Sequence, residues 1–155
     1  MTYKVAILMG SPNDMPKMQP AADTLAGFGI EPDVRVMSAH RNPDQVVDLV
    51  GNARERGYSA IICGAGMAAH LAGVAAAHTT LPVVGVPLSG GALNGVDALY
   101  STVQMPKGIP VATVAVDGSV NAALLVVQML AISDPDLEGK VVEDRKARAE
   151  AQTKG

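Results

Sequence analysis

The stretch SAHR, residues 38–41, places an imidazole beside a guanidinium just before a helix start. His40 can gain and lose a proton near neutral pH, which makes it a candidate general acid and base. Arg41 stays charged and presents a planar fork of donors that suits a phosphate group. This pair predicts proton transfer on a phosphorylated small molecule, and the simpler alternative is a histidine with a structural role.

A second candidate is the stretch GSPND, residues 10–14. Gly10 and Ser11 lead into a helix start, where free backbone N–H groups favour an anion. The stretch is neither a Walker loop nor a GxGxxG fingerprint. Taken alone, it equally predicts a tight strand-to-helix turn with Asp14 as the N-cap.

The remaining reactive side chains give weaker signals. His70 begins an Ala-rich helix, where capping or packing is the simpler interpretation, and His78 ends that helix, where a cation complements the dipole. Cys63 ends an apolar run and is expected to be a small buried hydrophobic residue. The Gly-rich residues 88–95 could cover a ligand or only connect two elements. No His, Cys and carboxylate set has metal-ligand spacing, so we expect no metal site.

The elements that position these residues show a regular alternation. Continuous apolar runs predict strands buried on both faces, at residues 3–9, 34–37, 59–63, 82–87 and 109–116. Segments with apolar residues at helical spacing predict helices at residues 17–28, 43–57, 67–78, 96–104 and 120–133. Five βα units with right-handed crossovers predict an α/β fold, a three-layer doubly wound parallel sheet with the flavodoxin-like order 2-1-3-4-5.

Boundary residues refine this prediction. Asn42 and Pro43 predict an N-cap followed by proline at the first helical position, and Gly57 is predicted to close that helix. Pro20 falls inside the first helical segment, which either kinks there or begins its regular part there. We expect one catalytic domain over residues 1–133. The charge-rich residues 134–155 predict a C-terminal extension, helical and then frayed, either solvated or packed on a neighbouring subunit.

Ligands of open parallel sheets bind beyond the carboxyl ends of the strands, at the point where the strand order reverses. In the order 2-1-3 this point brings together three loops that are far apart in the sequence. They are residues 10–14, 38–41 and 64–70. Their convergence strengthens the prediction of a phosphorylated ligand at this edge.

Composition narrows the classes of partner. With 155 residues, 48% hydrophobic, the chain can bury the core of one domain. A net charge of −3, with no basic block before the C-terminal tail, argues against nucleic acid, and 3% aromatic residues leave few platforms for a stacked base or flavin. One cysteine allows no intramolecular disulfide and suits a reducing compartment. Without a signal peptide or an apolar span, we expect a cytoplasmic protein with no membrane partner.

A set of motifs occurs in one order along the chain: MGSPND, SAHRNPD, GAGMAAHLAG, PVVGVP, NGVDALYSTVQMPKGIPVATVAV and NAALLVVQML. Together they closely resemble the class I N5-carboxyaminoimidazole ribonucleotide mutases of purine biosynthesis. The resemblance extends from about Val5 to Leu130, and SAHR, AAHL and VQMP are its most specific parts.

The resemblance implies that a carboxylate moves from the exocyclic nitrogen of an aminoimidazole ribonucleotide to the neighbouring ring carbon, without metal, ATP or organic cofactor. It implies a homo-octamer with sites at subunit boundaries. His40 would be the acid/base, and His70 would shape the ring and carboxylate pocket. Ser11 and Arg41 would hold the phosphate and Asp14 the ribose hydroxyls. The other implied substrate-binding residues are Ser38, Ala39, Gly66, Ala68 and Leu71.

Some positions depart from the family pattern. Pro12, Asn13, Met15, Met67 and Ala72 replace its usual residues but leave the named polar residues intact. The stretch VDGSV, before NAALL, is shorter than the usual Gly-rich turn, which leaves any contact from that loop open.

Two alternatives remain from the sequence. One is a related enzyme that carboxylates the aminoimidazole directly with CO₂. The other is a non-catalytic receiver or flavin-binding domain of the same architecture. A receiver needs a phosphoacceptor Asp after the third strand, where this chain has GAG.

Overall fold

The computed structural model describes residues 2–154. Within these residues a five-stranded parallel sheet has the order β2-β1-β3-β4-β5. Its strands are β1 (Lys4–Met9), β2 (Glu31–Val36), β3 (Ala60–Gly66), β4 (Val83–Leu88) and β5 (Ala112–Thr113). The predicted fold class and strand order are therefore confirmed.

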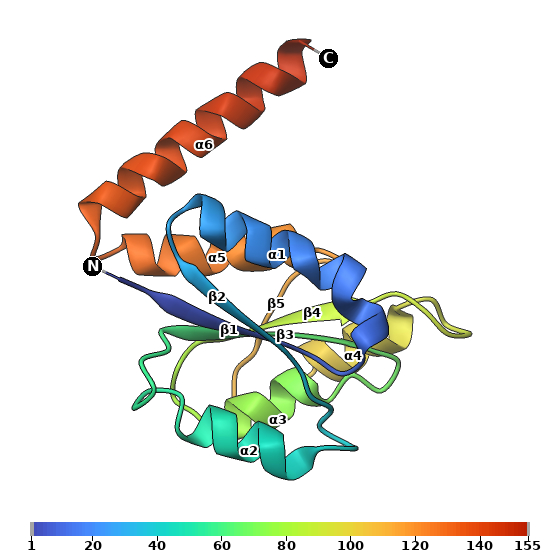
Figure 1. The fold of residues 1–155 in the computed structure, drawn as a ribbon. Coiled ribbons are helices and arrows are strands. Elements are labelled where there is room, and N and C mark those ends of the chain that lie inside the picture. Colours follow the sequence, from blue (N-terminus) through green and yellow to red (C-terminus); the bar gives the residue numbers. More distant parts are fainter. Residues whose placement is uncertain (1, 155) are drawn as a thin grey trace.

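Helices cover both faces of the sheet, which makes three layers (Figure 1). On one face lie α1 (Met15–Gly27) and α5 (Ser119–Ala131), and on the other lie α2 (Pro43–Gly51), α3 (Leu71–Ala77) and α4 (Val96–Val103). A short 3₁₀ turn, η1 (Pro12–Asp14), precedes α1. The last helix, α6 (Pro135–Lys154), contacts α5 at its start and then projects away from the body (Figure 1). In the described chain no helix is both long and apolar enough to cross a membrane.

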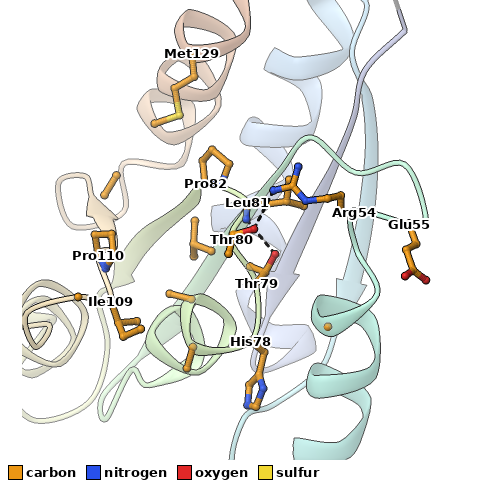
Figure 2. Close-up of a pocket in the computed structure, with 16 residues that line it drawn as sticks. Arg54, Glu55, His78, Thr79, Thr80, Leu81, Pro82, Ile109, Pro110 and Met129 are labelled. Atoms are coloured by element: carbon orange, nitrogen blue, oxygen red, sulfur yellow. Dashed lines mark hydrogen bonds between the residues drawn. The ribbon is translucent and has the colours of Figure 1, made fainter.

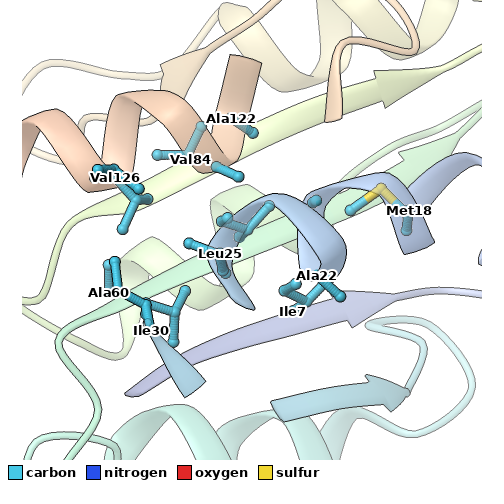
Figure 3. Close-up of a cluster of buried hydrophobic side chains, with 14 of the residues drawn as sticks. Ile7, Met18, Ala22, Leu25, Ile30, Ala60, Val84, Ala122 and Val126 are labelled. Carbon is cyan, nitrogen blue, oxygen red and sulfur yellow. The ribbon is translucent and has the colours of Figure 1, made fainter. Parts of the chain in front are cut away.

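The sheet separates two hydrophobic cores, because successive strand residues point to opposite faces. Ile7 of β1 packs in the core with Leu25 of α1 and Val126 of α5 (Figure 3). The next residue, Leu8, packs in the other core with Leu71 of α3. Both faces of the central strands are thus buried. This explains why their sequences are continuously apolar rather than alternating.

Two glycines in the central strands allow helices to approach the sheet closely. A Cβ at Gly64 would lie 2.4 Å from Sδ of Met18, on α1. A Cβ at Gly85 would lie 2.4 Å from Cγ2 of Thr102, a buried residue of α4. The absence of a side chain at these positions sets the distance between the layers.

The edge strands differ from the prediction that every strand is buried on both faces. β2 is largely half-buried or exposed, and it begins at Glu31, before the predicted start at Val34. Pro32 and Asp33 lie within it, which an edge strand tolerates because one side of its backbone pairs with no neighbour. At the other edge β5 is only Ala112–Thr113 long.

The helix predicted to close at Gly57 ends earlier. α2 ends at Gly51, and the side-chain amide of Asn52 donates to the carbonyl of Asp48 at 2.8 Å. This bond satisfies a carbonyl at the helix end and competes with continuation of the helix. Gly57 lies in the following turn with a φ of 83°. A glycine after a helical segment was the reason for expecting a helix end, but here the glycine serves a separate turn.

Two further boundaries concern α1 and α6. Pro20 lies inside α1, which begins at Met15 directly after η1, so the helix starts well before this proline. α6 is one continuous helix as far as Lys154. Gly155, the last residue of the predicted frayed end, lies outside the described residues.

Candidate active site

A cavity of about 440 Å³ lies at the carboxyl edge of the sheet, where the loops after β1, β2, β3 and β4 meet. It lies at the reversal of strand order that the sequence predicted. Every residue predicted for the site lines this cavity: Ser11, Asp14, Ser38, Ala39, His40, Arg41, Gly66, Ala68, His70 and Leu71. The fold therefore brings together side chains from three separate loops.

The SAHR loop is held by a local hydrogen-bond pattern. The hydroxyl oxygen of Ser38 accepts from the backbone N–H groups of His40 and Arg41, each at 3.2 Å. Asn42 occupies the N-cap position of α2, as predicted, but its side chain makes no capping bond. Its Oδ1 instead accepts from the N–H of Ser38 at 3.3 Å. Ser38 and Asn42 thus close the loop that carries the two candidate side chains, His40 and Arg41.

The rings of His40 and His70 are in direct contact. His40 Nε2 lies 2.8 Å from His70 Nδ1, and the rings are T-shaped, with an interplanar angle of 85°. One of these nitrogens donates and the other accepts, so the tautomer of each ring depends on the other. His70 is the N-cap of α3 but makes no side-chain capping bond, so its contact with His40 replaces the capping role considered from sequence. Both side chains are exposed to the cavity.

The GSPND loop presents a free carboxylate. Ser11 accepts from the N–H of Asn13 at 3.2 Å and caps η1. Asp14 precedes α1 without a side-chain capping bond, so its carboxylate is left for the cavity. Burial raises the pKa of Asp14 against the opposing effects of a backbone hydrogen bond at Ser11 and the charge of Lys17. A carboxylate held in partial burial suits a ligand that supplies hydroxyl donors.

The Gly-rich loop after β4 also contributes to the cavity. Ser89, Gly90 and Gly91 line it, with Met67 from the loop after β3. Gly91 has a φ of 66°, and a Cβ there would lie 3.2 Å from Cγ of Met67. The sequence pointed to this loop as a cover or a connection. It did not single out these lining residues, because only contacts between loops identify them.

The other reactive residues lie away from this cavity. Cys63 is buried in β3, and burial raises the pKa of its thiol, as fits a packing residue. His78 lines a larger cavity of about 990 Å³ at the amino edge of the sheet (Figure 2). There Arg54 donates to the hydroxyl of Thr80 at 3.0 Å. The carboxyl-edge cavity, although smaller, holds the paired histidines and is where parallel sheets bind ligands.

Within residues 2–154 no three His, Cys, Asp or Glu side chains are grouped so that they could hold a metal ion. The side chains that line the carboxyl-edge cavity include imidazole, guanidinium, hydroxyl and carboxylate groups.

A doubly wound α/β domain with paired imidazoles, a carboxylate and an arginine in one cleft defines a class of protein, an enzyme that acts on a small molecule. The chain belongs to the AIR carboxylase family, whose sequence profile matches residues 4–151. This membership decides against a non-catalytic receiver or flavin-binding domain.

Individual relatives agree with the family match. The chain is 50% identical to the N5-carboxyaminoimidazole ribonucleotide mutase of Pyrococcus abyssi, over 92% of this chain and 82% of that protein. It is 52% identical to the protein of the same name from Brucella melitensis, over 97% of this chain and 94% of that one. Among solved structures, PurE of Treponema denticola matches with a TM-score of 0.89 and 28% identity, covering 99% of this chain and 96% of that one. These matches confirm the resemblance found in the sequence.

Proposed function

We propose that this chain is an N5-carboxyaminoimidazole ribonucleotide mutase of de novo purine biosynthesis. It converts the N-carboxylated ribonucleotide into 4-carboxy-5-aminoimidazole ribonucleotide. The observation that carries this proposal is the contact of His40 with His70 in the cavity that Asp14 and Arg41 also line. The names and identities of the relatives support the same function.

The proposed reaction is an isomerisation. The bond between the exocyclic nitrogen and the carboxylate breaks, which leaves CO₂ and a nucleophilic ring carbon, and a new carbon–carbon bond then forms between them. His40 protonates the departing nitrogen and later removes the proton from the tetrahedral ring carbon, so that it ends in its starting state. The cavity keeps CO₂ and the ring in near-attack geometry until they recombine.

The other residues bind or orient. His70 holds the tautomer and orientation of His40, a role that their 2.8 Å contact supports. Ser11 and Arg41 bind the phosphate, and Asp14 binds the ribose hydroxyls. The remaining wall of the substrate pocket consists of Ser38, Ala39, Gly66, Ala68 and Leu71. The shared cavity of these residues supports the assignment.

The organisation of the chain is part of the proposal. Residues 1–133 form the catalytic domain and residues 134–155 form an extension that packs on a neighbouring subunit of a cytoplasmic homo-octamer. An exposed apolar face near the cavity supports assembly, since a subunit interface buries such a face. Val96, Tyr100 and Val103 lie on one side of α4, with Tyr100 62% exposed.

The test compares two substrates. Purified enzyme is incubated with the N-carboxylated ribonucleotide in ¹³C-bicarbonate, and separately with aminoimidazole ribonucleotide plus ¹³C-bicarbonate, and the C-carboxylated product is followed by NMR. We expect rapid product formation in the first reaction with little ¹³C incorporated, since CO₂ stays in the closed site. The His40→Asn variant controls for spontaneous decarboxylation. Efficient use of the second substrate pair would identify a direct carboxylase instead.

A further inference from the structure

Ser89, the first residue after β4, has each of its polar atoms held by a charged side chain. Its N–H donates to Asp117 Oδ1 at 2.9 Å, and its hydroxyl donates to Asp117 Oδ2. Lys17 Nζ donates to the Ser89 carbonyl at 2.7 Å and to its hydroxyl oxygen at 2.9 Å. Lys17 and Asp117 also form an ion pair with an N–O distance of 3.8 Å. We call these three residues the Ser89 clamp.

The Ser89 clamp joins three parts of the chain that are distant in sequence. Lys17 lies in the first turn of α1, Ser89 follows β4, and Asp117 lies in the turn before α5. The hydroxyl of Ser119, only 2% exposed, donates to the backbone carbonyl of Lys17 at 2.6 Å. This buried bond ties the backbone of Lys17 to the turn that carries Asp117. The two charged residues are therefore held relative to each other before they engage Ser89.

Asp117 has a backbone conformation that fits a specific role. Its φ is 60°, in the left-handed region that residues other than Gly, Asn and Asp rarely adopt. Its N–H donates to the carbonyl of Pro87 at 2.9 Å, so the turn is also bonded to the end of β4. A residue held in a sparsely populated conformation beside a cavity is a candidate for function. Here the conformation aims both carboxylate oxygens at Ser89.

The residues that follow the clamp depend on it for their position. Gly90 and Gly91 line the cavity with φ values of 142° and 66°. Glycines in such conformations have many alternatives, since they lack a Cβ. The direction in which the chain leaves Ser89 consequently decides where the two glycines lie relative to the rest of the cavity.

We infer that Lys17 and Asp117 are positioning residues for the ribonucleotide, which hold Ser89 so that Gly90 and Gly91 form a preformed wall of the binding cavity. The identity of the ligand rests on the proposed function, whereas the mechanical role of the clamp does not. Releasing the loop makes the ligand bear the cost of ordering it, which weakens binding. The proton transfers assigned to His40 are unaffected once the ligand is bound.

The variants follow from the geometry. Asp117→Gly removes both carboxylate contacts and suits a φ of 60°, so it leaves the fold intact. Asp117→Asn also tolerates this backbone and keeps an acceptor for Ser89, so its effect lies between those of the wild type and the glycine variant. Lys17→Met removes the ammonium that holds Ser89. The same ammonium lowers the pKa of Asp14, so this variant also changes a residue of the cavity, and Asp117→Gly is the more specific test. Arg56→Met is the matched control. It breaks an exposed ion pair between Arg56, which follows α2, and Asp48, which lies in α2.

Two measurements test the clamp on the full-length protein. Hydrogen exchange of residues 88–95 without ligand should accelerate roughly tenfold in Lys17→Met and Asp117→Gly, because the loop opens more often. KM for the ribonucleotide should rise about five- to tenfold, with kcat within about twofold of wild type. The double variant should be little worse than the worse single variant, since each change releases the same residue. Arg56→Met should leave every value unchanged.

Several outcomes would overturn the inference. Unchanged exchange in the loop would show that the clamp does not hold it. Faster exchange with an unchanged KM would show that the loop position does not matter for binding. A fall in kcat alone would assign the pair to another step. If the wild type does not process the ribonucleotide at all, the proposed function fails, while the exchange comparison still decides whether the clamp holds the loop.

Discussion

In the proposed function, the side chains at the carboxyl edge have two kinds of role, proton transfer for His40 and substrate binding for residues such as Arg41. The His40–His70 contact couples two rings, because His40 Nε2 lies 2.8 Å from His70 Nδ1 and one of these nitrogens must donate to the other. In the proposed function, the neighbouring Arg41 and Ser11 bind the phosphate. This division predicts that changes at the two kinds of residue affect different kinetic constants.

Removing the imidazole of His40 should abolish most turnover without preventing binding. We expect His40→Asn to retain the fold and lower kcat at least ~10²-fold, the range expected for lost proton transfer. Calorimetric titration with the product would verify that binding remains. His78→Asn, at the far end of α3, is the matched control and should have wild-type activity. A near-wild-type rate in His40→Asn would refute the acid/base assignment.

The ionised carboxylate of Asp14 should lower the stability of the folded protein while contributing to ribonucleotide binding. Its pKa is raised above the ordinary value of 3.8, chiefly by burial, so its ionised form is less favourable in the folded state than in the unfolded state. The stability associated with Asp14 is therefore complete below the unfolded pKa and is lost as the pH rises through the folded pKa. Asp14→Asn should be more stable than wild type at neutral pH, with the difference shrinking toward about pH 4.

Thermal unfolding of wild type and Asp14→Asn across this pH range would check the expectation. Asp23→Asn, at an exposed position on the following helix α1, should show no such gain. Ribonucleotide binding should weaken in the Asp14 variant alone. A variant that is less stable than wild type at neutral pH would contradict the assignment of burial as the dominant effect.

At the scale of elements, the close contact between β4 and α4 holds both ends of the Gly-rich loop that lines the cavity. Gly85 of β4 leaves room for the buried Thr102 of α4. The same strand leads into Ser89, and α4 follows the Gly-rich loop. Displacing α4 would thus move both ends of a loop that lines the cavity.

Gly85→Ala should destabilise the fold by roughly 1–3 kcal/mol, because the added methyl group overlaps Thr102 in a packed core. Gly51→Ala is the control, since nothing lies within 4 Å of a Cβ there, and it should be neutral or stabilising by up to about 1 kcal/mol. Urea denaturation at equal protein concentration compares the two. Equal stabilities would mean that the α4 contact relaxes without cost.

At the scale of the whole molecule, two surfaces are left without a cover inside one chain. One is the apolar side of α4, beside the candidate site. The other is α6, which contacts the body through Leu137 and Val141 and projects from it toward the C-terminal end of the helix (Figure 1). Ile132, just before α6, is 85% exposed. An assembly that covers both surfaces accounts for them together.

Light scattering should report a mass near eight times the 15.9 kDa of one chain. Tyr100→Glu, which places a charge in the apolar side of α4, should shift the protein toward smaller species and lower its activity. Tyr100→Phe keeps that side apolar and should remain assembled. A monomer at micromolar concentration in the wild type would contradict the octamer.

The local sequence pattern determined the fold class and the place of the site. Continuous apolar runs and helical spacing depend on residues close in sequence, so they identified five βα units along the chain. The strand order was then expected from the doubly wound architecture that such units form. Once the order was known, the carboxyl-edge rule placed His40 and His70 at one edge, although they are 30 positions apart. The exposed edge strands and the early end of α2 were mispredicted, because they depend on which neighbours each segment meets.

Only the tertiary structure decided which atoms meet. The His40–His70 contact and the clamp on Ser89 each need loops from different strands to arrive in register. The sequence around Asp117 and around Lys17 does not predict that both side chains bond to Ser89. Such pairs depend on the packing of whole layers, set by small residues such as Gly64 and Gly85. Short-range patterns predict the helices and strands along the chain, whereas contacts between distant residues form only when the layers pack.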